Sequence, residues 1–94
     1  MPHYFIAQIK IHDQAEYDKY LDGFDEVFDR YNGTVLAVDD HTVVLEGTWP
    51  LPRTVLIRFD TEREFYDWYN SSGYRELMKH RQRAAEGNVV LIEG

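Results

Sequence analysis

Residues 46–81 read EGTWPLPRTVLIRFDTEREFYDWYNSSGYRELMKHR, and this stretch decides the fold. The proline-containing run Trp49–Pro52 restricts the backbone to extended and turn conformations, so it makes a rigid connection into the strand predicted over Arg53–Phe59. Thr61 with Glu64 forms a capping box, which predicts a helix directly after that strand. The other predicted strands and helices are assigned outward from this strand and helix.

The helical region is interrupted at Asn70–Gly73, because Asn, Ser and Gly favour caps and turns over helix interiors. Its period resumes from Tyr74 to Ala85, and Gly87–Asn88 predicts its end. The continuous apolar run Val89–Ile92 is typical of a strand that is covered on both faces. The second half of the chain therefore reads strand, interrupted helix, strand.

The first half begins with a strand and a long amphipathic helix. His3–Ile11 alternates between apolar and more polar residues, which predicts a strand with one dry and one mixed face. Asp13 and Glu16 form a second capping box, and apolar residues then follow at helical spacing as far as Tyr31. Asn32–Gly33 supplies the stop signal of this helix.

Two short β-branched segments, Thr34–Val38 and Thr42–Glu46, lie between that helix and the prolines. The Asp39–His41 segment that separates them suits either a tight turn or a bulge within one long strand. We favour one interrupted strand.

The order βαββαβ predicts an α+β fold, the ferredoxin-like plait, in which a four-stranded antiparallel sheet carries both helical regions on one face. The other face would expose Ile6, Leu56, Val44 and either Val90 or Ile92. An apolar patch of this size is too large for a small soluble monomer, so we expect a homodimer through the helix-free sheet face.

Composition restricts the classes of function. The 94 residues contain no linker and form a single domain, residues 1–94. A net charge of −7 repels phosphate backbones, so we expect no nucleic-acid partner. The absence of a signal-like start and of any run approaching ~18 apolar residues predicts a cytoplasmic protein that does not bind membranes.

Short matches spread over the whole chain carry a family resemblance. They are Tyr17–Tyr20, Asn32–Thr34, Leu45–Trp49, Val55–Phe59, Trp68–Ser71 with Tyr74, Arg81 and Val90–Gly94. As a set they resemble the DUF1330 family, small bacterial proteins of the dimeric α/β-barrel type. The resemblance implies the plait and the dimer, and it implies no defined activity. Arg58 departs from it, where the family commonly has an acid, as does Gly73, where proline or an acid is frequent; local ion pairing and the start of the last helical segment are therefore expected to differ.

Arg81 is the most informative charged residue. It shares a helical face with Tyr74, Leu77 and Met78, so its guanidinium is expected to point inward. An inward arginine needs carboxylates, and we predict a structural ion pair between Arg81 and Glu46 or Glu93 near the strand ends. The alternative role of Arg81 is to anchor an acidic ligand.

A ligand cleft, if the fold holds one, is predicted between the sheet and the second helical region, where the break at Asn70–Gly73 leaves a gap and free amides. Ser71 and Ser72 are the ordinary alternative partners of those amides. Aromatic walls, hydrogen-bond donors and one fixed charge make up the candidate ligand-binding set: Trp49, Trp68, Tyr69, Tyr74, His80 and Arg81. Aromatic residues at this spacing more often form plain core.

His41 and His80 are the acid–base candidates, although neither has a neighbour in the sequence that would fix its tautomer, and both also suit the surface. The chain has no metal-binding pattern, phosphate loop or nucleophile motif, so no metal and no cofactor are predicted.

Two hypotheses about function follow. One is a protein, catalytic or not, that takes a small acidic or aromatic molecule in the cleft; the other is a non-catalytic structural or interaction dimer with a filled core and no ligand site.

Overall fold

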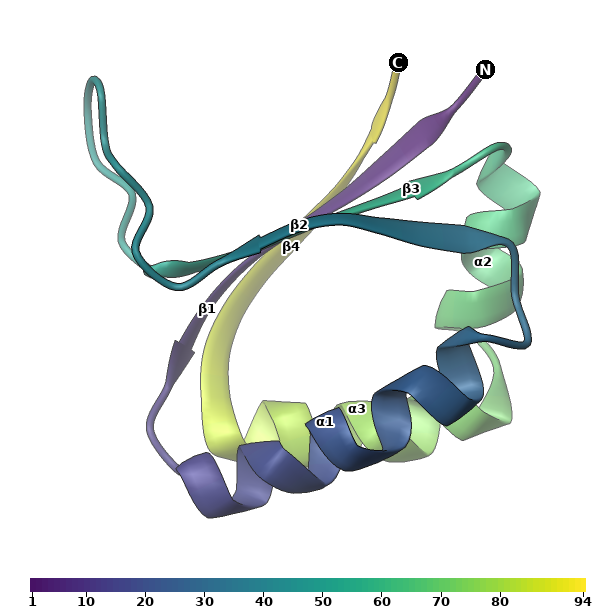
Figure 1. The fold of residues 1–94 in the computed structure, drawn as a ribbon, viewed down its shortest axis with the longest axis horizontal. Coiled ribbons are helices and arrows are strands. Elements are labelled where there is room, and N and C mark those ends of the chain that lie inside the picture. Colours follow the sequence, from purple (N-terminus) through teal and green to yellow (C-terminus); the bar gives the residue numbers. More distant parts are fainter.

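The computed structural model describes residues 1–94, which form one antiparallel sheet with helices on one face (Figure 1). The four strands lie in the order β2-β3-β1-β4. The elements are β1 (His3–Ile11), α1 (Gln14–Phe28), β2 (Gly33–Asp39), β3 (Arg53–Phe59), α2 (Glu62–Tyr69), α3 (Ser72–Ala84) and β4 (Ala85–Glu93). The predicted ferredoxin-like α+β architecture is confirmed.

The central strand β1 fixes the register of the sheet. Phe5 lies opposite Ile57 of β3 on one side and opposite Leu91 of β4 on the other. Because side chains alternate along a strand, Phe5, Ala7 and Ile9 all face the helices and are buried. The core therefore lies between this face of the sheet and the helix layer, and it is rich in aromatic rings.

Both predicted capping boxes begin helices as expected. The Asp13 carboxylate accepts a hydrogen bond from the Glu16 amide at 3.1 Å, and the Thr61 hydroxyl accepts one from the Glu64 amide at 3.1 Å. The break in the second helical region is real and separates α2 from α3. α1 ends at Phe28, earlier than its apolar spacing predicts.

The predicted stop at Gly87–Asn88 was wrong, because both residues lie inside β4. α3 passes directly into β4 at Ala85, and Gly87 pairs with Ile9 of the central strand. A Cβ atom on Gly87 would lie 3.3 Å from Arg81 Nη1. Gly87 therefore leaves room for a buried guanidinium, a packing role that its turn-forming tendency does not reveal.

The predicted continuation of the second strand over Thr42–Glu46 was also wrong. β2 ends at Asp39, whose carboxylate accepts a hydrogen bond from the His41 amide at 2.8 Å, so this segment makes a turn. The bulge lies earlier, between Val35 and Ala37. Residues 40–52, which we call the arm, contain no strand, because β-branched residues form one only beside a partner strand.

The arm projects beyond the end of the sheet and bends away from the helix layer (Figure 1). Most of its apolar side chains have little cover: Val43 and Leu45 are 82% and 89% exposed, whereas Leu51 is buried. Its base is tied to the start of β3 by bonds from Arg53 to Asp40 (2.6 Å) and from Trp49 to Thr54 (3.0 Å). The arm is thus held at its base and extended at its tip.

None of the helices combines the length and the apolar character needed to cross a membrane. The cytoplasmic location expected from the sequence stays a prediction.

Candidate functional site

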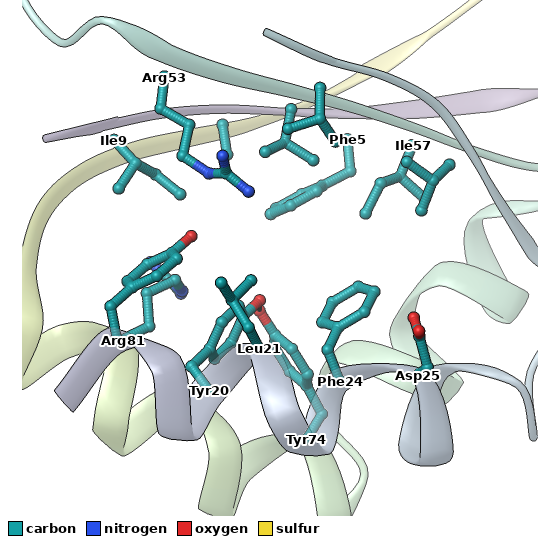
Figure 2. Close-up of a pocket in the computed structure, with 15 residues that line it drawn as sticks. Phe5, Ile9, Tyr20, Leu21, Phe24, Asp25, Arg53, Ile57, Tyr74 and Arg81 are labelled. Atoms are coloured by element: carbon teal, nitrogen blue, oxygen red, sulfur yellow. Dashed lines mark hydrogen bonds between the residues drawn. The ribbon is translucent and has the colours of Figure 1, made fainter. Parts of the chain in front are cut away.

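A cavity of about 290 Å³ lies between the sheet and α1. Inward-facing residues of β1, β2 and β3 form its roof, α1 forms one wall, and two residues of α3, Tyr74 and Arg81, complete it (Figure 2). The predicted cleft belonged to the α2–α3 side of the sheet. The cavity instead lies beneath α1, whose tyrosines and leucine line it.

Arg81 is the most unusual residue of the cavity. It is 8% exposed, yet it takes part in none of the ion pairs of the molecule. Its guanidinium carbon lies 6.0 Å from the centre of the Tyr20 ring. Burial acts to lower the pKa of Arg81, but the neighbouring Tyr74 and Tyr20 hydroxyls outweigh burial and raise it, so the group stays charged.

The predicted ion pair of Arg81 with Glu46 or Glu93 was wrong. Glu46 is exposed on the arm and Glu93 is exposed at the end of β4. The physical reason is the path of the two segments. The arm that carries Glu46 bends away from the helix layer (Figure 1). Arg81 lies near Gly87, toward the start of β4, whereas Glu93 is at the other end of that strand. The guanidinium is left without a carboxylate partner.

Tyr20 and Tyr74 place a pair of hydroxyls next to Arg81. Their oxygens are 2.7 Å apart and share one hydrogen bond. Burial raises the pKa of Tyr74, and it raises the pKa of Tyr20 well above its ordinary value. Both hydroxyls are therefore protonated at neutral pH, and the pair retains a proton to donate to a third oxygen.

Arg53, the first residue of β3, enters the cavity from the sheet side (Figure 2). Its guanidinium carbon lies 5.7 Å from the centre of the Tyr17 ring, and its Nη1 donates to Asp40 Oδ1 at 2.6 Å. Burial acts to lower the pKa of Arg53, but Asp40 and the Tyr17 hydroxyl together outweigh burial and raise that pKa. Unlike Arg81, Arg53 has its counter-ion.

The cavity is polar at one end and apolar at the other (Figure 2). Arg53, Arg81 and the tyrosine hydroxyls gather at one end, while Phe5, Phe24 and Ile57 line the other. The lining has one carboxylate, that of the exposed Asp25, which lies on the side away from Arg81. These groups suit the binding and electrostatic stabilisation of an anion beside an apolar body.

The structure brings together only two of the six predicted ligand-binding residues, Tyr74 and Arg81. Trp68 is fully buried in the core against Tyr74, with ring centres 4.2 Å apart, and its Nε1 has no hydrogen-bond partner. Tyr69 is half-buried and stacks on Phe65 with ring centres 5.1 Å apart. For Trp68 and Tyr69 the alternative reading, plain core packing, describes what they do.

The other two predicted residues lie outside the cavity. Trp49 is on the arm, where it lines a separate hollow of about 330 Å³. His80 hydrogen-bonds through Nδ1 to the Glu16 carboxylate and links α3 to the start of α1. His41, the second acid–base candidate, is exposed just after β2.

One of the free amides predicted at the helix break, that of Tyr74, already has a partner. Ser71 Oγ accepts a hydrogen bond from the Tyr74 amide at 3.2 Å and donates one to the Trp68 carbonyl at 2.7 Å. Ser71 is thus the N-cap of α3, as the ordinary alternative predicted.

Tyr17, Tyr20 and Arg53 were missed as site residues. The two tyrosines lie on the apolar stripe of α1 and were used only to predict that helix, although a buried tyrosine hydroxyl needs a polar partner. Arg53 has the same parity as Val55, Ile57 and Phe59, and that alternation was a signal that it points toward the helices.

Comparisons with known proteins agree with the fold. A family model described as "Domain of unknown function (DUF1330)" matches residues 2–94. No curated protein matches the sequence.

Solved structures with the same fold share little sequence with this chain. RPA0582, a protein of unknown function from Rhodopseudomonas palustris, is 19% identical with a TM-score of 0.80, covering 99% of this chain and 82% of its own. A dimeric ferredoxin-like protein of unknown function from Jannaschia sp. CCS1 is 10% identical with a TM-score of 0.76, covering 100% of both chains. SnoaB, a cofactor-independent oxygenase from Streptomyces nogalater, is 13% identical with a TM-score of 0.70, covering 99% of this chain and 92% of its own. At these identities the likeness shows the fold alone.

Proposed function

This protein belongs to the DUF1330 family, and we propose that it binds a small organic acid with an apolar body in the cavity between the sheet and α1. The single observation that carries the proposal is the buried guanidinium of Arg81, which has no carboxylate partner. The tyrosine hydroxyls keep this guanidinium charged, and a bound anion would supply the negatively charged partner that the protein does not provide. The cavity beside this charge favours a ligand site over the alternative of a filled core.

The polarity of the cavity suggests how the ligand lies. Its carboxylate or enolate oxygen faces Arg81 and accepts a hydrogen bond from the Tyr20–Tyr74 pair. Its apolar body extends toward Phe5 and Ile57. The volume of about 290 Å³ suits a molecule with one aromatic ring or a short branched chain, since drug-sized ligands occupy pockets of roughly 300–1,000 Å³.

Calorimetric titration with benzoate, phenylacetate and 1-naphthoate tests the proposal. At least one of these acids is expected to bind, and Arg81→Met is expected to weaken that binding at least about tenfold, since a charge-assisted contact is lost. Arg83→Met is the matched control, because Arg83 is an exposed arginine on the same helix and does not line the cavity. Binding that is unaffected by Arg81→Met, or weakened equally by Arg83→Met, contradicts the assignment of the cavity.

We also propose that the protein is a homodimer through the helix-free face of the sheet. Val90 and Ile92 are exposed on β4, and their register partners Ile6 and Tyr4 lie beside them on the same face. Solved structures of this fold, including that from Jannaschia sp. CCS1, are described as dimeric. The acidic residues of α1 lie in the other layer, so a second copy would meet a face without their charge.

Sedimentation of the Ile92→Glu variant tests the dimer. The parent is expected to sediment as a dimer at micromolar concentration, and Ile92→Glu as a monomer, because the substitution would bury a carboxylate in the interface. Tyr66→Glu, which changes an exposed aromatic residue on α2, is expected to leave the dimer intact. A parent that sediments as a monomer would show the interface proposal to be wrong.

A further inference from the structure

The two arginines of the cavity differ in their charge balance. Arg53 donates to Asp40 at 2.6 Å, and its side chain is only 17% exposed, so that pair is partly shielded from water. Arg81 is buried and has no such partner. The polar end of the cavity therefore has two guanidiniums but only one positive charge that is not already balanced.

We propose that Asp40 makes the cavity selective for singly charged acids over doubly charged ones. This inference rests on the proposed function of the cavity, and it assigns to Asp40 a positioning and charge-balancing role through Arg53. Asp40 itself does not line the cavity; it lies at the start of the arm and is 58% exposed. Its carboxylate occupies Arg53 Nη1 and holds the guanidinium at the roof of the cavity.

A doubly charged ligand would have no favourable place for its second charge. Toward the far end it would meet Phe5, Phe24 and Ile57, where an unpaired carboxylate loses its hydration. Beside Arg53 it would meet a guanidinium whose charge Asp40 already neutralises. The remaining charged group of the lining, Asp25, is itself an acid.

The chain provides a matched control next to Asp40. Asp39 carries the same charge, but its carboxylate accepts from the His41 amide and forms no ion pair with Arg53. An asparagine at position 39 preserves that acceptor, so Asp39→Asn changes the net charge without changing the partner of Arg53.

The experiment measures the affinities of benzoate and phthalate by calorimetric titration at pH 7.5, where benzoate carries one charge and phthalate two. The parent is expected to prefer benzoate, and Asp40→Asn is expected to shift the ratio of the two affinities toward phthalate by about tenfold. Asp39→Asn is expected to leave the ratio unchanged. In an Arg53→Met background the effect of Asp40→Asn is expected to vanish, because Asp40 acts through Arg53.

Three results would overturn the inference. They are an unchanged ratio in Asp40→Asn while both acids still bind, an equal shift in Asp39→Asn, and a shift that persists in the Arg53→Met background. If the parent binds neither benzoate nor phthalate, this inference fails, and the proposed function fails with it only if phenylacetate and 1-naphthoate do not bind either. All three of the other results require binding, so the two failures are distinguishable.

Discussion

A guanidinium without a counter-ion changes what a substitution at Arg81 is expected to do. In a buried ion pair, removing one partner leaves the other charge unpaired and destabilises the protein by about 3–5 kcal/mol. Arg81 has no carboxylate to leave behind. Its removal takes a charge out of a buried position, and its long side chain can be replaced by an apolar one of similar length.

We therefore expect Arg81→Met to unfold at the same temperature as the parent or at a higher one in the absence of ligand. Thermal denaturation followed by circular dichroism measures this, with Arg83→Met as the exposed control. A stabilisation of about 1 kcal/mol would raise Tm by roughly 4–8 °C in a domain of this size. A fall in Tm of that amount would show instead that Arg81 braces the fold.

Arg53 and Arg81 show how far a sequence can predict a site. The inward direction of Arg81 followed from helical spacing, and it is confirmed by the burial of the residue. Its partner was not predictable, because local spacing says nothing about which distant carboxylates the chain path brings near. Arg53 could have been found from strand parity, but its ion pair depends on the turn after β2, which opens the arm.

At the scale of elements, local signals predicted those parts of the chain that local interactions stabilise. The helix caps could be predicted from the sequence, because each cap side chain accepts a hydrogen bond from the amide three residues later; the caps are Asp13, Thr61 and Ser71. Residues 42–46 were wrongly predicted to form a strand. Their β-branched residues favour one, but no other strand of this chain lies beside them to pair with. The cavity under α1 was not predictable, because it depends on how far the helix lies from the sheet, which no periodicity encodes.

The link between Glu16 and His80 joins the start of α1 to α3, and it predicts a pH dependence. The hydrogen bond from His80 lowers the pKa of Glu16 from its ordinary value of 4.5, and the nearby Lys19 contributes in the same direction. A carboxyl group whose pKa is lower in the folded state adds stability above its unfolded pKa and loses it as the pH falls through the folded pKa.

We therefore expect the parent to be more stable than Glu16→Gln at pH 6, and the two to become equally stable as the pH falls below about 4.5. Urea denaturation at a series of pH values measures the difference. Glu26→Gln, which changes an exposed acid on the same helix that pairs only with Arg30, serves as the control. A difference between parent and Glu16→Gln that stays constant from pH 6 to pH 3 would rule out this link as its source.

At the scale of the whole molecule, the arm is separable from the core. Within one chain the tip of the arm contributes no buried side chain, whereas Leu51, near the end of the arm, is buried. We expect a variant in which Val43–Thr48 is replaced by Asn-Gly to keep its helix content and to unfold within a few degrees of the parent. Circular dichroism measures both properties. Loss of the folded spectrum would mean that the arm is needed for the sheet to form.

The position of β1 at the centre of the sheet also governs how the chain reaches this structure. His3 pairs with Phe59 on one side and with Glu93 on the other, so neither neighbour of β1 is nearby in sequence. Closing such long loops costs entropy before the contacts repay it, and topologies of this kind fold more slowly than helical ones. During synthesis β1 leaves the ribosome long before β4 exists. Until that last strand arrives, one edge of β1 offers unpaired amides and carbonyls to any other extended chain, and aggregation competes with folding at that edge.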